Sequence, residues 1–285
     1  RLVGSEMCIR DSPTPSSTIS YTSTFGKRDQ DSQEIVQTTR PVTSILDVKE
    51  NGLENDWNHS LSYENKFDTK DRKLNANVSY SYGPEHETEK NLSKEVNINN
   101  ITIKDRHDYN NTIVSFDYED KFGEKLALEA GFKTTLKALD DDLFFQNGTY
   151  DYLYDEDIYA LYTTMGYEFN DRFGLKGGLR FERVETIARV VGDTTVATSI
   201  THFVINQAVK SGEFNNPYSH FYPSMSLNYK LTEIAQIQFS YSKRVNRPRT
   251  RSLNPFPRDM LDTTITEANL GAEGPPAPPK TGSYC

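Results

Sequence analysis

The chain has few cysteines and no long apolar run. Its 285 residues include two cysteines, Cys8 and Cys285, close to opposite ends, so neither a disulfide framework nor a cysteine metal site is expected. No apolar run approaches the roughly 18 residues that a membrane-spanning helix needs. A transmembrane helix is therefore not expected. Alternating strands stay possible, because alternation halves the apolar signal of each segment.

Excess positive charge is also absent. The formal net charge is −9 at pH 7, whereas binding nucleic-acid phosphates needs a basic field, so we expect no nucleic-acid partner. The chain has no G-x-S-x-G, no H-E-x-x-H and no glycine-rich phosphate loop, and its five histidines lack ligand spacing. We therefore expect no catalytic residue, no cofactor and no metal site, and hence no enzyme.

Uncharged residues instead recur at every second position in several stretches. The clearest is 159–169, where Tyr159, Leu161 and Met165 share one face and Ala160 and Tyr162 share the other. The same pattern, with no Asp, Glu, Lys or Arg on the chosen face, fills residues 57–63, 74–82, 112–118, 126–132, 173–181, 221–229 and 235–241. A two-residue period predicts β-strands with one apolar face.

Alternation alone also fits a soluble β-sandwich whose inner face is dry, so the positions of the aromatic residues matter. They fall at the ends of the stretches. One group lies beside short connections: Tyr63, Tyr118, Phe169, Phe173 and Tyr229. The other group lies at the far ends: Trp57, Tyr82, Phe132, Tyr159, Phe181, Phe221 and Tyr241. Two aromatic belts are typical of a transmembrane barrel held at both lipid interfaces.

The connections between stretches alternate between short and long. Residues 27–56, 83–108, 133–157 and 182–220 are expected to be long loops, whereas the intervening connections hold roughly ten residues or fewer. This alternation favours short periplasmic turns and long extracellular loops. With a weaker strand at 18–26, the pattern predicts an all-β, antiparallel, up-and-down transmembrane barrel, present as an incomplete segment of about nine strands.

The two ends of the chain differ from this pattern. Residues 1–12, RLVGSEMCIRDS, resemble translated adaptor sequence and lack the apolar core of a signal peptide, so we interpret them as a non-native segment. Residues 13–266 are expected to form the partial barrel domain. Residues 267–285, which include GAEGPPAPPK, are expected to be unstructured or corrupted.

The sharpest local motif is SYSKRVNRPRTRSLNPF, from Ser240 to Phe256. Together with the preceding FYPSMSLNYKL, it resembles the signature of TonB-dependent outer-membrane receptors of the Bacteroidetes type. The motif residues that the resemblance marks as possible contacts in the barrel interior or at its rim are Arg244, Asn246, Arg247, Pro248, Leu253, Asn254, Pro255 and Phe256. Beyond Phe256 the chain departs from the family pattern.

The resemblance implies a receptor in the bacterial outer membrane, in contact with its lipid, that imports a scarce ligand. The energy would come from TonB through an N-terminal plug domain, and neither a plug nor a TonB-contacting segment is visible in this sequence. The identity of the ligand stays open, since iron chelates, cobalamin, oligosaccharides and peptides are all carried by this architecture.

The motif also concentrates positive charge in an acidic chain. Arg244 shares the face opposite Phe239 and Tyr241, so we expect it to pair with carboxylates inside the barrel. An anionic ligand and lipopolysaccharide phosphates are the alternatives. The acidic residues of 140–142 and 151–157 are expected to form a solvated loop, without the spacing of a calcium loop.

Two other functions stay open at this point. A soluble β-sandwich adhesin or carbohydrate-binding module would use the apolar face as an inner core. A β-rich glycosidase would need a pair of carboxylates that sequence alone does not identify.

Overall fold

The computed structural model describes residues 2–38, 44–67, 72–93, 101–145, 148–192, 212–247 and 280–284. Within these residues all regular structure is β-strand. The strands are β1 (Leu2–Thr14), β2 (Ser17–Thr38), β3 (Ser44–Lys66), β4 (Lys73–Ser93), β5 (Ile101–Phe122), β6 (Leu126–Phe145), β7 (Gly148–Asn170), β8 (Phe173–Gly192), β9 (Gly212–Asn215), β10 (Tyr218–Lys230), β11 (Gln236–Asn246) and β12 (Lys280–Tyr284). The described residues contain no helix that could span a membrane.

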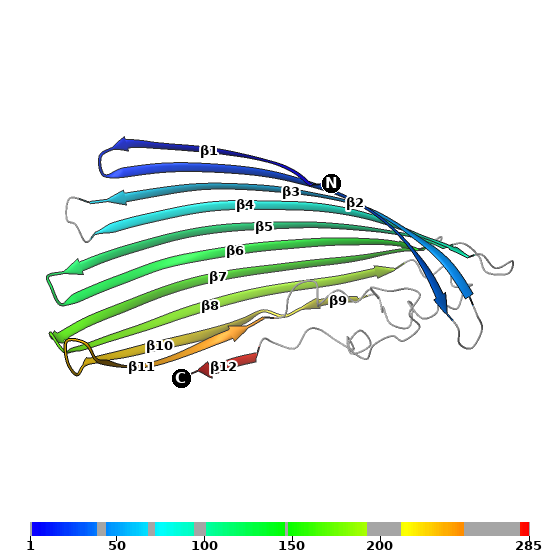
Figure 1. The fold of residues 1–285 in the computed structure, drawn as a ribbon. Helices are drawn as coiled ribbons and strands as arrows, with labels where there is room; N and C mark the ends of the chain where they lie inside the picture. Colours follow the sequence, from blue (N-terminus) through cyan, green and yellow to red (C-terminus); the bar gives the residue numbers. More distant parts are fainter. Residues whose placement is uncertain are drawn as a thin grey trace.

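The strands form one 12-stranded antiparallel sheet in chain order, with β9 paired to β8 beside the main path. Figure 1 shows this sheet as a single curved layer, with the hairpin connections of β1–β2, β5–β6, β7–β8 and β10–β11 at the same end. Consecutive pairing of neighbours is the up-and-down topology that the alternation predicts, and all nine expected strands are present. The sheet is not closed, because β1 and β12 are its two edges.

The expected long loops are wrong in large part. Strands β2 to β8 run for 20 to 23 residues, so most of 27–56, 83–108 and 133–157 continues the ladder beyond the apolar stretches. Cross-strand polar pairs support these extensions. Arg28 pairs with Glu54 at 2.7 Å, and Gln33 donates to Asp47 at 2.7 Å. In the strand extensions, charged residues occur on both faces and the buried apolar residues lie on the face opposite to that of the apolar stretches, so the pattern that indicated the strands does not continue. These buried residues are Ile103, Leu139, Leu143, Tyr152 and Tyr154.

Both ends of the chain contribute strands that the sequence did not predict. Residues Leu2–Thr14 form β1 and pair in register with β2, from Leu2 opposite Arg28 to Asp11 opposite Ile19. Residues Lys280–Tyr284 form β12 against β11. Lys280–Tyr284 lie in the segment that was expected to be unstructured or corrupted, and the structure has a strand there, whereas residues 1–12 were left out of the fold prediction. That residues 1–12 are a non-native segment stays a prediction from the sequence.

The exposure of the two faces matches the predicted orientation of the strands. Leu161 is 63% exposed on the predicted outward face, whereas Ala160, its neighbour on the opposite face, is 4% exposed. Other exposed residues of the outward face are Trp57, Leu61, Tyr63, Val78, Tyr80, Phe116, Phe132, Tyr159, Met165, Tyr167, Phe169, Leu179, Phe221, Met225, Tyr229, Ile237 and Phe239. A sandwich would bury this face under a second sheet, and the described residues form only one.

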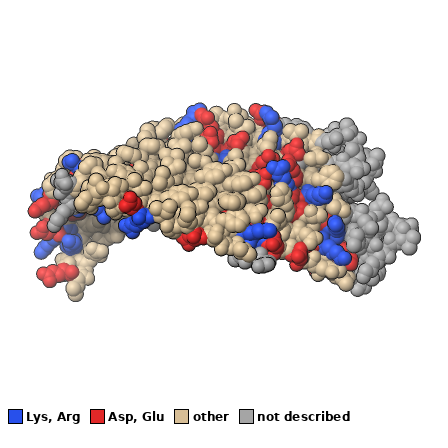
Figure 2. Space-filling view, turned by 90° about the horizontal axis from the view of Figure 1, so that it is seen from above, with Lys and Arg blue, Asp and Glu red and all other residues tan. Residues whose placement is uncertain are grey.

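Charge is distributed along the strands as an outward face in lipid requires. In the view of Figure 2, a mostly uncharged band lies between the charged side chains at the left end and those spread over the right half of the molecule. We call the face with the exposed apolar residues the outer face and the opposite face the inner wall.

Candidate functional site

An ion-pair network on the inner wall joins three strands. We call it the arginine cluster: Arg180 and Glu182 on β8, Tyr218 and Tyr222 on β10, and Arg247 just after β11. Arg180 Nε donates a hydrogen bond of 2.6 Å to Glu182 Oε1, and Arg247 Nη2 donates to Glu182 Oε2. Arg247 Nε also donates to the Tyr218 hydroxyl at 3.3 Å. The Glu182 carboxylate, only 5% exposed, is therefore held between two guanidinium groups.

A second set of inner-wall residues extends this network to β5. Tyr162 on β7 donates a hydrogen bond to Asp117 on β5, and the guanidinium carbon of Arg180 lies 5.3 Å from the centre of the Tyr162 ring. Asp117, Gly131, Tyr162 and Arg180 occupy one register row across β5 to β8. Cation–π contact and hydrogen bonds thus link neighbouring strands along this row.

Gly131 makes that row possible. A Cβ atom at this position would lie 2.5 Å from the carbonyl oxygen of Phe116 and 2.9 Å from Cε2 of Tyr162. The Tyr162 side chain therefore crosses β6 at its glycine to reach Asp117. Such close approach of a ring to the backbone is a usual reason for glycine inside a strand.

The described residues of the motif differ in exposure and in ion pairing. Arg247, and not Arg244, lies beside a carboxylate; Arg244 is an exposed inner-wall residue with no ion-pair partner among the described residues. Asn246 is exposed at the end of β11. The rest of the motif lies outside the described residues: Pro248, Leu253, Asn254, Pro255 and Phe256. Sequence reasoning did not single out Glu182, Tyr218 or Tyr222. Glu182 and Tyr222 directly follow the belt residues Phe181 and Phe221, which was a usable signal, whereas Tyr218 lies inside the expected loop 182–220.

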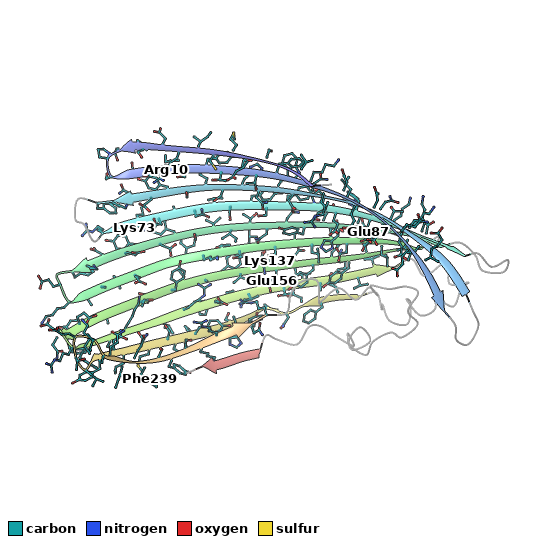
Figure 3. All side chains as sticks on the ribbon, in the orientation of Figure 1. Arg10, Lys73, Glu87, Lys137, Glu156 and Phe239 are labelled. Carbon is teal, nitrogen blue, oxygen red and sulfur yellow. The ribbon has the colours of Figure 1, made fainter. Side chains whose placement is uncertain are left out.

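A lysine–glutamate pair lies farther along the inner wall. Lys137 Nζ on β6 donates to Glu156 Oε1 on β7 at 2.7 Å, and the Tyr154 hydroxyl donates to Oε2 at 3.4 Å. Figure 3 shows Lys137 and Glu156 next to one another near the middle of the sheet. Glu156 and Tyr154 are both buried, so the pair is positioned by tight packing and neutralises a buried carboxylate.

An acidic cluster occupies the strand extensions beyond the apolar stretches. It consists of five acidic residues and one basic residue, His107. The acidic residues are Glu50, Glu85, Glu87, Asp105 and Asp141. In the register, Glu87 lies opposite Asp105, Glu85 opposite His107, and His107 opposite Asp141. His107 Nδ1 is paired with Asp141 Oδ1. Figure 3 labels Glu87 toward the end of the sheet away from the short connections.

Burial, hydrogen bonds and repulsion between like charges shift the pKa values of this cluster, which lies outside the membrane-spanning stretches. Burial, followed by a hydrogen bond and repulsion from Glu50, raises the pKa of Glu87 to about 7. Burial, followed by repulsion from Asp141, raises the pKa of Asp105 to about 6. The hydrogen bond to Asp141 raises the pKa of His107, although burial opposes it. The cluster therefore exchanges protons near neutral pH.

The acidic residues expected in a loop lie in strands instead. Asp140, Asp141 and Asp142 belong to β6, and Asp151 and Asp155 belong to β7. Alternation places Asp141 on the inner wall and Asp140 and Asp142 on the outer face, so the run is divided between the two faces. Among the described residues, no group of three or more His, Cys, Asp or Glu side chains is arranged to hold a metal ion.

A hollow of about 540 Å³ lies at the end of the sheet with the short connections. Its lining includes Gly166, Gly174, Lys176, Lys121, Glu124 and Asn228. The hollow exists partly because its lining glycines, Gly166 and Gly174, have no side chains to fill it. A third lining glycine, Gly123 in the β5–β6 turn, has a φ of 68°, a backbone conformation that favours glycine. The lining offers charge of both signs and no pairing of a nucleophile with a base.

The belt residues of the outer face make direct ring contacts. The ring centres of Phe169 and Phe173 are 5.0 Å apart, and those of Phe181 and Phe221 are also 5.0 Å apart. Trp57, Tyr63, Phe132, Tyr159, Phe169, Phe221 and Tyr229 are exposed. The remaining belt residues, Tyr82, Tyr118, Phe173, Phe181 and Tyr241, are half-buried.

Comparison with known proteins gives a family match and several similar folds. The model of a family described as "Outer membrane protein beta-barrel family" matches residues 65–270. No curated protein matches the chain.

Three solved structures are similar in fold. The ferric yersiniabactin uptake receptor FyuA from Yersinia pestis is 10% identical with a TM-score of 0.53, and the match covers 86% of this chain and 46% of that one. The alcaligin outer-membrane receptor FauA from Bordetella pertussis is 12% identical with a TM-score of 0.58, covering 87% and 36%. The ferric citrate transporter FecA in its unliganded form is 11% identical with a TM-score of 0.56, covering 86% and 36%. The chain thus spans less than half the length of each, and the likeness shows the fold.

Proposed function

The chain belongs to the outer membrane protein beta-barrel family, and on that premise we propose that it is part of a receptor that takes up a scarce ligand in a TonB-dependent manner. Its place is the bacterial outer membrane. The short connections would face the periplasm and the strand extensions the outside, as is usual for such barrels. TonB would act through a plug domain, and the protein would bind and pass its cargo without chemical change.

The observation that carries this proposal is the contrast between the two faces of one sheet. The outer face exposes uncharged residues such as Leu161 and Met165, at 63% and 56% exposure. The inner wall carries charged networks, with Glu182 buried between two arginines. Lipid requires the first surface, and a water-filled or plugged interior requires the second.

The likeness in fold to FyuA, FauA and FecA supports a receptor over other barrels, because their names describe an uptake receptor, an outer-membrane receptor and a transporter. Strand length also supports it. Strands such as β3 and β7, at 23 residues, are about twice as long as the 9 to 11 residues that a tilted strand needs to span the bilayer. The surplus forms a wall outside the membrane that can contact cargo.

Growth of the source bacterium under limitation of single nutrients tests the proposal. Deletion of the complete reading frame should slow growth when one nutrient, such as iron or cobalamin, is limiting, and growth should recover when that nutrient is supplied in excess. The same deletion in a strain lacking TonB should add no further defect, since the receptor would already be inactive. If the deletion slows growth as much in the strain lacking TonB as in the strain that has it, TonB-dependent uptake is excluded.

A further inference from the structure

Tyr222 on β10 has a buried hydroxyl without a hydrogen-bond partner. The residue is 6% exposed, and its hydroxyl oxygen is one of the few buried side-chain atoms that remain unpaired in the described part of the chain. A buried hydroxyl normally has a partner, because burial without one costs free energy. Tyr222 lies opposite Arg180 in the register of β8 and β10 and belongs to the arginine cluster.

The surroundings of Tyr222 have more donors than acceptors. Arg180 uses Nε on Glu182, and Arg247 uses Nε and Nη2 on Tyr218 and Glu182. A guanidinium group has five N–H donors, so both arginines retain donors after these bonds. Glu182 is the one carboxylate that both contact, and its two oxygens are already engaged.

Arg244 adds positive charge beside the cluster. Ser224 on β10 lies opposite Ser242 on β11, and the next inner-wall residues along these two strands are Tyr222 and Arg244. Arg244 is exposed and has no ion-pair partner among the described residues. Arg180 and Arg247 contact Glu182, and Arg244 lies on the neighbouring strand at the register position beside Tyr222, so arginines outnumber the one glutamate of the cluster.

We propose that Tyr222, Arg180, Arg244 and Arg247 form a site on the inner wall for a carboxylate group. The Tyr222 hydroxyl would donate to one carboxylate oxygen, and the remaining guanidinium N–H groups would donate to the other. The inference rests on the proposed function, because cargo or a segment inside the barrel would supply the carboxylate. Its two sources would be a free ligand and an Asp or Glu side chain of the protein itself.

The chemistry of the cluster favours a carboxylate over a phosphate. The arginines already hold one carboxylate, Glu182, and the planar fork of a guanidinium matches a second. A doubly charged phosphate would meet stronger repulsion from Glu182 than a singly charged carboxylate. Succinate serves as the probe, because it can place one singly charged carboxylate group in the site and keep its second one in solvent, with inorganic phosphate and chloride at equal ionic strength as comparisons.

The test uses the protein expressed from its complete reading frame and purified in mild detergent. The midpoint of heat unfolding is followed by the change in gel mobility, for the wild type, Tyr222→Phe and Tyr229→Phe. Tyr229 lies on the same strand but on the outer face, so it is the matched control. If the site takes free carboxylates, succinate at about ten times its dissociation constant should raise the wild-type midpoint by about 1 to 2 °C. Tyr222→Phe should lose this rise, and Tyr229→Phe should keep it.

If a side chain of the protein fills the site, succinate should have no effect, but Tyr222→Phe should lower the midpoint by several degrees relative to Tyr229→Phe. The variant Arg244→Gln should lower it as well. The proposal is overturned if succinate has no effect and Tyr222→Phe unfolds at or above the wild-type temperature, as expected when an unpaired hydroxyl is removed. Equal protection by phosphate would overturn the preference for carboxylate. None of these measurements depends on TonB. The carboxylate site can therefore be disproved while TonB-dependent uptake is demonstrated, and uptake can be disproved while the site is demonstrated.

Discussion

Arg247 donates a hydrogen bond to Glu182 across β10, linking residues that are 65 positions apart in the chain. The contact joins the segment after β11 to β8, and Arg180 holds the other oxygen of the same carboxylate. Glu182 therefore pairs with two arginines at once and offsets one of their two positive charges. Its removal would leave both guanidinium groups facing each other on a poorly solvated part of the inner wall.

We expect Glu182→Ala to lower the free energy of unfolding by about 3 kcal/mol, because breaking a buried ion pair leaves uncompensated charge. Denaturant unfolding of the detergent-solubilised protein measures this. Glu185→Ala is the control: its pair with Arg183 is half exposed, with a 3.3 Å contact, and should contribute less than about 1 kcal/mol. Equal effects of the two substitutions would contradict the importance assigned to the arginine cluster.

Adjacent residues on β11 test the orientation of the sheet. Phe239 is 51% exposed on the outer face, and its neighbour Gln238 points to the inner wall. Phe239→Arg should cost about 2 to 4 kcal/mol if the side chain faces the middle of the bilayer, whereas Gln238→Arg should be close to neutral. Folding into lipid vesicles at increasing urea concentration provides the measurement. A larger loss for Gln238→Arg would reverse the assignment of the two faces.

The requirement for glycine at position 131 can be tested against a second strand glycine. Gly131→Ala places a Cβ 2.5 Å from the Phe116 carbonyl oxygen, and we expect a loss of about 1 to 3 kcal/mol from overpacking. Gly177→Ala on β8 meets no atom within 4 Å and should be neutral or stabilising by about 0.4 to 1 kcal/mol. Unfolding in denaturant compares the two. Equal stability of both variants would show that Tyr162 does not need the gap at Gly131.

The sequence was sufficient for the sheet and its orientation, because those depend on contrast between alternate residues. In 159–169, Leu161 and Met165 differ in polarity from their neighbours, and the structure exposes both. The strand extensions do not continue this pattern. Around Asp105 and Asp141 charged residues occupy both faces, and the apolar residues Ile103, Leu139 and Leu143 are buried on the inner wall instead of the outer face. The chain there was interpreted as loop although β5 and β6 continue through it.

The arginine cluster was only partly accessible to sequence reasoning for a different reason. The motif identified Arg244 and Arg247 as charged residues near the end of a strand, but pairing depends on the path of the chain after β11. Alternation assigns Arg244 to the inner wall, and it does not indicate that Arg247 turns back across β10 to reach Glu182. The unpaired Tyr222 hydroxyl likewise follows from three-dimensional packing alone.

The acidic cluster predicts that the strand extensions lose stability as the pH rises. Glu87 has a pKa of about 7 in the folded protein and an ordinary value of 4.5, so the folded state binds the proton more tightly than the unfolded chain. Below about 4.5 both states are protonated and no penalty arises; the penalty grows through the interval up to about 7 and is complete above it. His107 acts in the same direction, because its raised pKa contributes stability that is lost as it deprotonates.

After allowance for solvent screening, we expect the extensions to be less stable at pH 8 than at pH 5 by about 1 kcal/mol. Hydrogen exchange of the backbone amides of β4 and β5, corrected for the intrinsic pH dependence of exchange, measures this locally. Glu87→Gln should remove most of the difference, because the amide cannot ionise beside Glu50 and Asp105. Greater stability at pH 8 in the wild type would contradict the raised pKa of Glu87, and with it the burial of this group and its contact with Glu50.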